Sequence, residues 1–178
     1  VAGNGISFTV RYKDTKRQVT LPLIGRFNIY NALTAAGMLI SDGADPAEVF
    51  DALPALRPLV GRMEMFSREG SPLVIVDFAH TPDGIEKSLM AAREHTKGIL
   101  TCVFGAGGDR DHGKRPLMAA SAEKFADRVF VTDDNPRSED PAAIRRDVAA
   151  GFTGALNDVG RKALVRTDFA DRAAAIRE

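Results

Sequence analysis

The sequence predicts an α/β fold in which helices cover both faces of a mostly parallel sheet. Three apolar runs, at 73–76, 99–104 and 128–132, are continuous rather than alternating, which is typical of strands buried on both faces. Each run is followed by a helical pattern, and strands that alternate with helices form parallel sheets. The second run ends in a glycine-rich, charged loop, which is where open α/β sheets bind ligands.

The composition excludes two broad classes of partner. Of the 178 residues, 44% are hydrophobic, which is enough for a core, and 24 Lys and Arg balance 24 Asp and Glu. A chain without net charge has no general attraction for nucleic acid or an anionic membrane, so any anion site must be local. No apolar run approaches the ~18 residues of a membrane span. We therefore expect neither a nucleic-acid nor a membrane partner.

The single cysteine, Cys102, lies inside the second apolar run. One cysteine excludes a disulfide framework and fits the reducing cytoplasm, where we expect the protein to reside. No histidine lies near it in the pattern, so we expect a core residue rather than a nucleophile. The three histidines lack the spacing of metal ligands, and we predict no metal site within this chain.

The first part of the chain predicts a hairpin followed by two helices. Residues 1–24 alternate apolar and polar positions, with a charged turn at 13–17. Small and apolar residues then favour a helix over 32–40. Asp45 caps a second helix, because Pro46 stands at its first position and a glutamate follows the cap by three residues.

A linker follows the second helix. Residues 53–62 contain two prolines and a glycine and show no periodicity. We place a domain boundary there, near Pro58, which divides the chain into residues 1–58 and 59–178.

Four strands are expected after the linker, each followed by a helix. The strands are expected at 73–76, 99–104, 128–132 and 163–166. The helices are expected to begin at Pro82, Pro116, Pro141 and Asp168, with Thr81 and Asp140 as N-caps of the first and third. Right-handed crossovers then place the loops 77–82, 105–115 and 133–140 at one edge of the sheet.

The loop at 105–115 fails two nucleotide-binding motifs. Its G-A-G-G-D-R start resembles a dinucleotide fingerprint, but Arg110 stands where close helix packing needs Gly or Ala. Its G-D-R-D-H-G-K-R part resembles a P-loop, but Arg115 replaces the hydroxyl that would hold magnesium. Four glycines and three cations still suit an anion site. The alternative is a solvated, charged loop.

Asp77 and His80 follow the first of these strands. Asp77 could accept a hydrogen bond from a ribose hydroxyl or coordinate magnesium, and His80 could donate to a phosphate. The alternative is that both side chains are satisfied by neighbouring backbone groups.

The segment Asp134-Asn135-Pro136-Arg137 places a carboxylate, an amide and a guanidinium on a rigid turn. This set suits a zwitterionic amino acid, with Arg137 for the carboxylate and Asp134 for the ammonium. The alternative is an Asx-turn before a capped helix, with Arg137 paired to Glu139.

Five blocks of the sequence together resemble the Mur ligases. They are G-R-F-N-I-Y-N (25–31), G-R-M-E (61–64), D-F-A-H-T-P (77–82), G-A-G-G-D-R-D-H-G-K-R-P (105–116) and D-N-P-R-S-E-D-P (134–141). The resemblance spans nearly the whole chain in family order. It implies that residues 1–58 are the end of the central ATPase domain. Residues 59–178 would be most of the Rossmann-like C-terminal domain.

The resemblance implies roles for residues on the nucleotide side. Asn28 and Asn31 resemble the asparagines that line the adenine side of the ATP site. Arg62 resembles the linker arginine that reaches the nucleotide phosphates when the domains close. Asp77 resembles the aspartate that contacts the ribose, and His80 lies beside the nucleotide in the same motif. Among these, Arg62, Asp77 and His80 are the expected catalytic residues.

A second set resembles the family's recognition site for the incoming amino acid. Its members are Arg110, Asp134, Asn135, Pro136 and Arg137, with Lys114 as a further member of the same loop. The D-N-P-R form is the one associated with meso-diaminopimelate. Lysine and ornithine stay open as alternatives.

The activity that the resemblance implies is an ATP-dependent amide ligation in peptidoglycan synthesis. ATP and Mg²⁺ would convert UDP-MurNAc-L-Ala-D-Glu to an acyl phosphate, which the amino group of the third amino acid attacks. The family's P-loop, magnesium-binding glutamate and carbamylated lysine have no counterpart in this sequence, nor has its G-K-G-H-E motif. We therefore expect this chain to be a fragment without ligase activity alone. The alternatives are a related amide ligase, such as folylpolyglutamate synthetase, and a non-catalytic α/β module that binds a nucleotide or amino acid.

Overall fold

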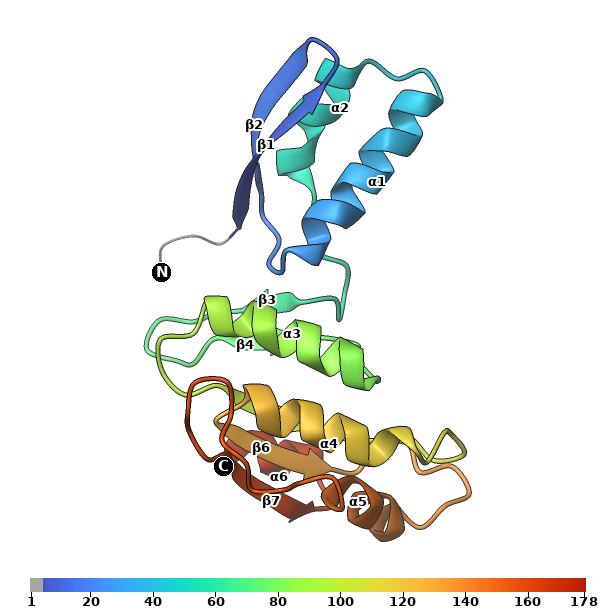
Figure 1. The fold of residues 1–178 in the computed structure, drawn as a ribbon, viewed down its shortest axis with the longest axis vertical. Coiled ribbons are helices and arrows are strands. Elements are labelled where there is room, and N and C mark those ends of the chain that lie inside the picture. The colour runs from blue at the N-terminus through green and yellow to red at the C-terminus, as the bar shows by residue number, and fades with distance from the viewer. Residues whose placement is uncertain (1–4) are drawn as a thin grey trace. The chain divides into compact units, whose positions relative to one another are not determined.

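The computed structural model describes residues 5–178, and these divide into two compact units. The first unit ends at Phe78, and the second unit runs from Ala79 to Glu178 (Figure 1). The first four residues of the predicted hairpin lie outside the described part of the chain. The expected boundary near Pro58 stays a prediction.

The first unit begins with the hairpin that the alternation predicts. Strands β1 (Ile6–Tyr12) and β2 (Thr15–Leu21) pair antiparallel, with Val10 opposite Arg17. The turn is shorter than the expected 13–17, because both strands continue to Tyr12 and Thr15. Lys13 in that turn adopts a φ of +51°.

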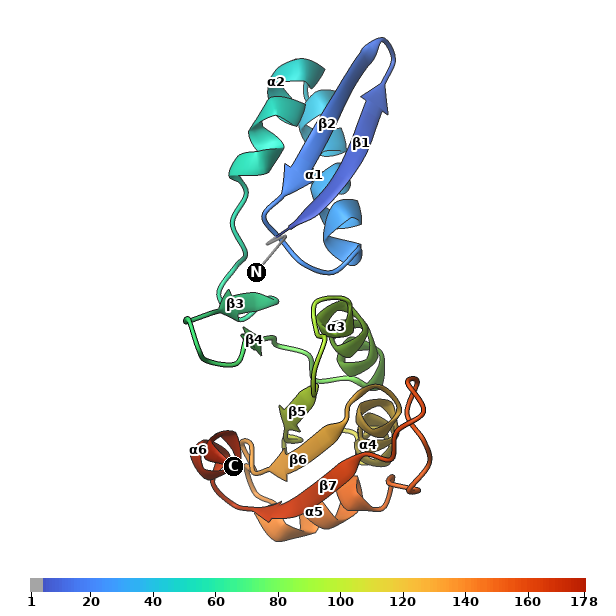
Figure 2. The ribbon, with the colours of Figure 1, turned by 90° about the vertical axis from the view of Figure 1, so that its left-hand side faces the viewer.

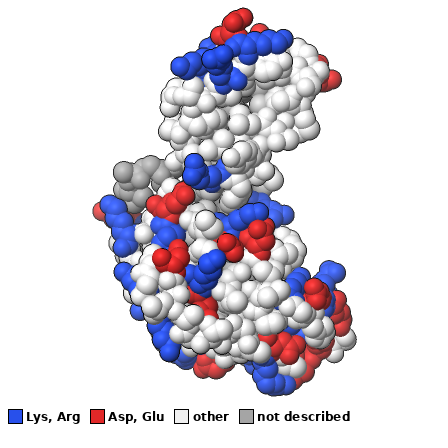
Figure 3. Space-filling view, in the orientation of Figure 1, with Lys and Arg blue, Asp and Glu red and all other residues white. Residues whose placement is uncertain are grey.

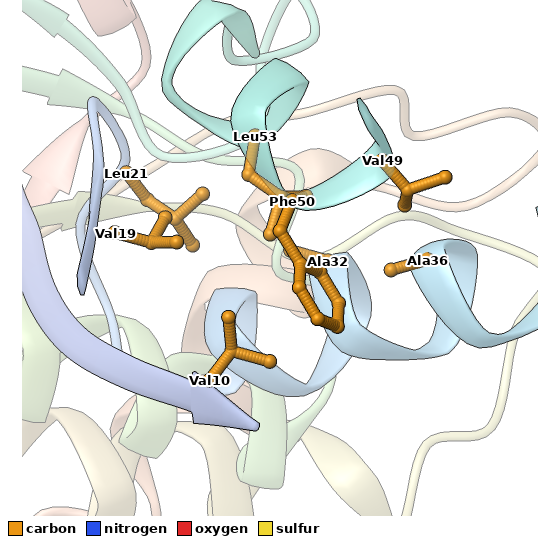
Figure 4. Close-up of a cluster of buried hydrophobic side chains, with 8 residues drawn as sticks. All are labelled: Val10, Val19, Leu21, Ala32, Ala36, Val49, Phe50 and Leu53. Carbon is orange, nitrogen blue, oxygen red and sulfur yellow. The ribbon is translucent and has the colours of Figure 1, made fainter. Parts of the chain in front are cut away.

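Two helices cover one face of the hairpin. Helix α1 (Phe27–Ser41) begins five residues before the predicted start, and α2 (Pro46–Ala52) is followed by the short 3₁₀ helix η1 (Leu53–Ala55). Their apolar side chains meet those of the hairpin in one cluster (Figure 4). Its buried members are Val10, Val19, Leu21, Ala32, Ala36, Val49, Phe50 and Leu53. This core is local to the first unit.

The apolar run at 73–76 does not join the parallel sheet, and that prediction is wrong. Strand β4 (Val74–Val76) pairs antiparallel with β3 (Glu64–Phe66) instead. Val74 is 48% and Val76 is 43% exposed, so the strand is not buried on both faces. Three consecutive apolar residues fit either kind of strand, and the run itself does not specify its partner.

The second unit holds a parallel sheet in the order β5-β6-β7, formed by Thr101–Phe104, Arg128–Thr132 and Leu164–Phe169. Its helices are α3 (Pro82–Glu94), α4 (Lys114–Phe125), α5 (Pro141–Ala149) and α6 (Arg172–Arg177). Helices α4 and α5 cover one face, with α3 packed against α4, and α6 lies against the other face (Figure 2). The predicted fold class, a parallel sheet between helices, is confirmed.

Three predicted helix caps form. Asp45 accepts from the backbone N–H groups of Ala47 and Glu48, and Asp140 Oδ1 accepts from that of Ala142 at 3.0 Å. Thr81 Oγ1 accepts from the Gly84 N–H at 3.1 Å. Each cap satisfies an N–H group that has no partner within its helix.

Two helix starts differ from the expectation. Helix α4 begins at Lys114 rather than Pro116, since proline is tolerated anywhere in the first turn. The last helix begins at Arg172 behind an Asp171 cap, because Asp168 still belongs to β7.

Two surface properties of the described residues bear on function. No helix within residues 5–178 combines the length and apolarity that crossing a membrane requires. Acidic and basic side chains are interspersed on the face of the second unit that Figure 3 shows. A mixed surface of this kind gives no single-sign field on that face.

Candidate functional site

Two of the three predicted loops meet at the carboxyl edge of the parallel sheet. The glycine loop (residues 105–113) follows β5, and the DNPR loop (residues 133–140) follows β6. The Gly108 N–H donates to the Asn135 carbonyl at 2.9 Å, and Ser138 Oγ lies 2.6 Å from Asp109 Oδ1. Neighbouring parallel strands end at the same sheet edge, so the convergence of these two loops follows from the topology.

Glycine is required where the loops approach most closely. A Cβ atom at Gly108 would lie 1.8 Å from the carbonyl oxygen of Pro136. A Cβ at Gly105 would lie 2.5 Å from the carbonyl oxygen of Thr132. Both obstacles are backbone atoms, which cannot rotate away, so these glycines permit the contact between the loops.

Arg137 crosses from the DNPR loop to the glycine loop. Its Nη1 donates to the Gly108 carbonyl at 2.6 Å, and its backbone has a φ of +50°. The Asx-turn alternative is also present, since the Arg137 N–H lies 3.2 Å from Asn135 Oδ1. The expected alternative pairing of Arg137 with Glu139 does not form, because Glu139 binds Arg115 instead.

The remaining members of the predicted amino-acid set lie on the same two loops. Arg110 is exposed on the glycine loop, directly after Asp109, whose φ is +51°. Lys114 is the first residue of α4 and is half-buried. Asp134 lies 3.8 Å from the guanidinium of Arg172 at the start of α6. The sheet edge therefore presents guanidinium groups and a carboxylate together, which is the pairing a zwitterion needs.

A narrow cleft opens beside these residues. It is too narrow to hold a water molecule and is lined by Ala106, Thr132, Asp133, Asp134, Pro136, Pro141, Ile144 and Arg145. Asp133 on its wall is bound by Arg145. A complete small-molecule pocket usually exceeds ~300 Å³, so this cleft does not by itself form a ligand pocket.

Arg115 is a residue that sequence reasoning misread. The composition of the loop places it among the three cations of an anion site, but its side chain is only 1% exposed. It donates to both carboxylate oxygens of Glu139, at 2.7 and 2.9 Å, and to Asp147 at 2.8 Å. These hydrogen bonds, above all those to Glu139, raise the pKa of Arg115 despite its burial. The only feature of the sequence that sets Arg115 apart is its position, where a P-loop would have Ser or Thr.

Glu139 is the second residue that the sequence did not single out. The hydrogen bonds from Arg115, followed by one from the Asp109 N–H, lower the pKa of Glu139 to about 2. The carboxylate is therefore ionised at neutral pH.

Within the first unit, the G-R-M-E block and the start of the D-F-A-H block lie together. Asp77 Oδ2 accepts from the Met63 N–H at 2.9 Å, and Met63 has a φ of +49°. The guanidinium of Arg62 lies 5.0 Å from the ring centroid of Phe78, within reach of a cation–π contact. Asp77 thus holds the turn that carries Arg62.

The loop 77–82 spans the junction of the two units. Asp77 belongs to the first unit, and His80, which is exposed, belongs to the second. The preceding strand β4 pairs with β3, so sheet hydrogen bonds do not bring this loop to the edge where the other two meet. The nucleotide roles of Asp77 and His80 stay predictions.

Asn28 and Asn31 form a local amide chain at the start of α1. Asn28 Nδ2 donates to the Ile24 carbonyl at 2.8 Å, and Asn31 Nδ2 donates to Asn28 Oδ1 at 3.1 Å. The chain fixes the orientation of both amides beside the turn at Gly25, whose φ is +84°. Their adenine contacts stay predictions.

The described part of the chain contains neither a cluster of metal ligands nor an activated thiol. Residues 5–178 contain no group of three His, Cys, Asp or Glu side chains placed to hold a metal ion. Burial raises the pKa of the Cys102 thiol to about 12, so the thiolate does not form near neutral pH.

Comparison with known proteins identifies the chain's relatives. The sequence pattern described as "Mur ligase, glutamate ligase domain" matches residues 61–178. A UDP-N-acetylmuramoyl-L-alanyl-D-glutamate–2,6-diaminopimelate ligase of Vibrio cholerae serotype O1 is 50% identical over 152 residues, which are 85% of this chain and 31% of that protein. The enzyme of the same name from Vibrio vulnificus is 54% identical over 132 residues, 74% of this chain and 27% of that protein.

A solved structure of a UDP-N-acetylmuramoyl-L-alanyl-D-glutamate–2,6-diaminopimelate ligase has the same fold. It superposes with a TM-score of 0.60 at 36% identity and covers 96% of this chain and 34% of that one. The chain thus spans about a third of the length of the proteins it resembles. The family pattern covers the whole second unit and, in the first unit, the segment from residue 61 that carries Arg62. The chain belongs to the Mur ligase family.

Proposed function

We propose that this chain is part of an ATP-dependent ligase that adds meso-diaminopimelate to UDP-MurNAc-L-Ala-D-Glu. The observation that carries the proposal is that the glycine loop and the DNPR loop are joined by hydrogen bonds and present Arg110, Asp134 and Arg137 at one sheet edge. The activity named for the two Vibrio relatives supports the same assignment. We place the reaction in the cytoplasm, which the single cysteine favours.

The charges at this sheet edge favour a diamino acid that carries a carboxylate at each end. Diaminopimelate has two ammonium and two carboxylate groups, whereas lysine and ornithine have a single carboxylate. Two guanidinium groups, Arg110 and Arg137, can each pair with a carboxylate, and Asp134 can accept from an ammonium. Asn135 and Pro136 shape the turn between them, and Lys114 adds a positive charge at the start of α4.

The proposed reaction has two steps. A carboxylate oxygen of UDP-MurNAc-L-Ala-D-Glu attacks the γ-phosphorus of ATP, and ADP leaves. The free amine of diaminopimelate then attacks the carbonyl carbon of the acyl phosphate. Inorganic phosphate leaves, the nitrogen loses a proton, and an amide remains. The two loops would hold the amino acid so that its amine faces the acyl phosphate, which reduces the entropic cost of the second step.

The nucleotide side of the reaction is assigned to other residues. Asn28 and Asn31 would contact adenine, and Asp77 the ribose. Arg62 would stabilise charge on the phosphates when the domains close, with His80 beside the nucleotide. The anchoring of the Arg62 turn by Asp77 supports a shared role for these two motifs. Mg²⁺ would offset charge on the phosphoryl oxygens, and we assign it to no residue of this chain.

We also propose the domain division at residues 58 and 59, with the ATPase end before it and the ligase C-terminal domain after it. The start of the family match at residue 61 supports this division.

A substrate panel tests the proposal. The complete enzyme containing this segment is assayed with ATP, UDP-MurNAc-L-Ala-D-Glu and meso-diaminopimelate, L-lysine or L-ornithine, and the product is identified by mass. We expect kcat/KM for diaminopimelate to exceed that for lysine by about 100-fold, because lysine leaves one guanidinium unpaired. The 178-residue chain alone should give no product. A preference for lysine, or ADP release that does not depend on the amino acid, would contradict the proposal.

A further inference from the structure

We propose that Arg115 and Glu139 are positioning residues for the amino-acid site, and that they set the affinity for the amino acid without touching it. Glu139 binds both the buried guanidinium of Arg115 and the backbone of the glycine loop. This inference rests on the proposed function, because it concerns the loops that carry Arg110 and Arg137.

Arg115 is too deeply buried to contact a substrate. It is the largest fully buried side chain among the described residues. Its guanidinium binds Glu139 on the DNPR loop and Asp147 on α5, and it also lies 3.3 Å from the carbonyl oxygen of Gly107 on the glycine loop. One side chain in the first turn of α4 therefore joins both loops to the helix layer.

Glu139 connects this buried pair to the loop backbone. Its Oε1 atom accepts from Arg115 Nη2 at 2.7 Å and from the Asp109 N–H at 2.5 Å. Its Oε2 atom accepts from Arg115 Nη1 at 2.9 Å. A planar guanidinium that binds both oxygens of a carboxylate fixes that carboxylate in orientation as well as in position.

The constraint reaches residues close to Arg110 and Arg137 in the sequence. Gly107 and Asp109 are held by Arg115 and Glu139, and both lie within three residues of Arg110. Asp109 in turn accepts from Ser138 Oγ at 2.6 Å, next to Arg137. If the Glu139 contact is lost, the backbone that carries both guanidinium groups loses one of its anchors.

Asp147 provides a matched control. It accepts from the same guanidinium at 2.8 Å and lies 3.5 Å from Nδ1 of His112, but it is part of α5 and binds no backbone N–H group of the glycine loop. Glu139→Gln and Asp147→Asn each remove one negative charge beside Arg115. Only Glu139→Gln also weakens the hold on the Asp109 N–H, because a glutamine amide has a single oxygen for two donors.

The test measures both variants and Arg115→Lys in the complete enzyme. We expect Glu139→Gln and Arg115→Lys to raise KM for diaminopimelate about tenfold or more, since a lysine cannot replace a bidentate guanidinium. Asp147→Asn should change it less than about twofold, and KM for ATP should stay within about twofold in all three. If Arg115 and Glu139 contributed only to stability, the variants would contain less folded enzyme. The apparent kcat would then fall, while KM would stay unchanged.

Hydrogen–deuterium exchange of the peptide spanning residues 105–113 supplies a readout independent of activity. Faster exchange in Glu139→Gln than in Asp147→Asn is expected. Equal exchange in the two variants, or an equal rise in KM, would overturn the positioning role. If the unaltered enzyme uses no diamino acid, the proposed function fails, while the exchange data still decide whether Glu139 holds the glycine loop.

Discussion

Gly108→Ala is the substitution that most directly challenges the contact between the two loops. The new Cβ would lie 1.8 Å from the Pro136 carbonyl oxygen and 2.6 Å from its carbonyl carbon. Real contacts of this kind are longer than 3.0 Å, and neither obstacle can rotate away. The loops must therefore separate.

Separation of the loops breaks two hydrogen bonds of Gly108. Its N–H donates to Asn135 at 2.9 Å, and its carbonyl accepts from Arg137 at 2.6 Å. At ~1 kcal/mol for each hydrogen bond, the closed arrangement loses ~2 kcal/mol. A loss of this size corresponds to a change of about 30-fold in an equilibrium constant. KM for diaminopimelate should rise by about that factor if binding needs the closed loops.

The assay pairs urea unfolding of the 178-residue chain with substrate kinetics of the complete enzyme. Gly98→Ala is the control, because a Cβ there has no atom within 4 Å. It should leave KM unchanged and alter stability by less than ~1 kcal/mol. If Gly108→Ala matched Gly98→Ala in both measurements, the reasoning about the loop contact would be refuted.

Three further predictions concern other parts of the structure. Burial opposes ionisation of Asp127, yet hydrogen bonds from Arg93, the Leu100 N–H and Asn157 outweigh it and lower its pKa from 3.8 to about 2. Its folded-state pKa is depressed, so the stabilisation is present above about pH 4 and disappears as the pH falls through 2. Asp127→Asn should lower the free energy of unfolding by ~2 kcal/mol at pH 7, with the difference vanishing near pH 2; a constant difference across pH would contradict this. Gly151→Ala would place a Cβ 2.0 Å from the Pro116 carbonyl oxygen and should lower the thermal midpoint by several degrees, whereas Gly37→Ala, with no atom within 4 Å, should not. Asp77→Ala should raise KM for ATP at least about tenfold and leave KM for the amino acid unchanged, because Asp77 holds the Arg62 turn through the Met63 N–H. A rise in KM for the amino acid, with KM for ATP unchanged, would contradict the assignment of Asp77 to the nucleotide side.

The elements that the sequence predicts best are those with local signals. Strand β6 has its predicted bounds, Arg128–Thr132, because its run is apolar and buried on both faces. The caps at Thr81 and Asp140 are predictable because a side-chain oxygen at the N-cap, followed by proline at the first helical position, favours a helix start. This preference does not depend on what the helix packs against. Such features depend on neighbours within a few residues.

The features that the sequence did not predict depend on distant partners. The apolar run at 73–76 has the composition of a buried strand. Its antiparallel pairing with β3, rather than with the parallel sheet, depends on which segments pack together in the folded chain. Leu117 in α4 is apolar yet 58% exposed, whereas Arg115, two positions before it, is buried. A buried arginine is recognised only when its carboxylate partners are known, and Glu139 and Asp147 lie 24 and 32 residues away.

The candidate site divides in the same way. The loops 105–115 and 133–140 were predicted to converge because they follow neighbouring parallel strands, and sheet topology alone establishes this. The residues that hold them together were not predicted, since Glu139 was weighed only as a partner of Arg137. Glu139 and Asp109 are 30 residues apart, and no periodic pattern in the sequence indicates that they are in contact.

The most direct test of the central claim is the effect of Arg137→Ala on the two Michaelis constants of the complete enzyme. Arg137 lies on the DNPR loop, with Nη1 on the Gly108 carbonyl, so its removal affects the amino-acid site from both loops. We predict that KM for diaminopimelate rises at least about tenfold while KM for ATP stays within about twofold. A rise in KM for ATP with an unchanged KM for diaminopimelate would contradict the assignment of this sheet edge to the amino acid.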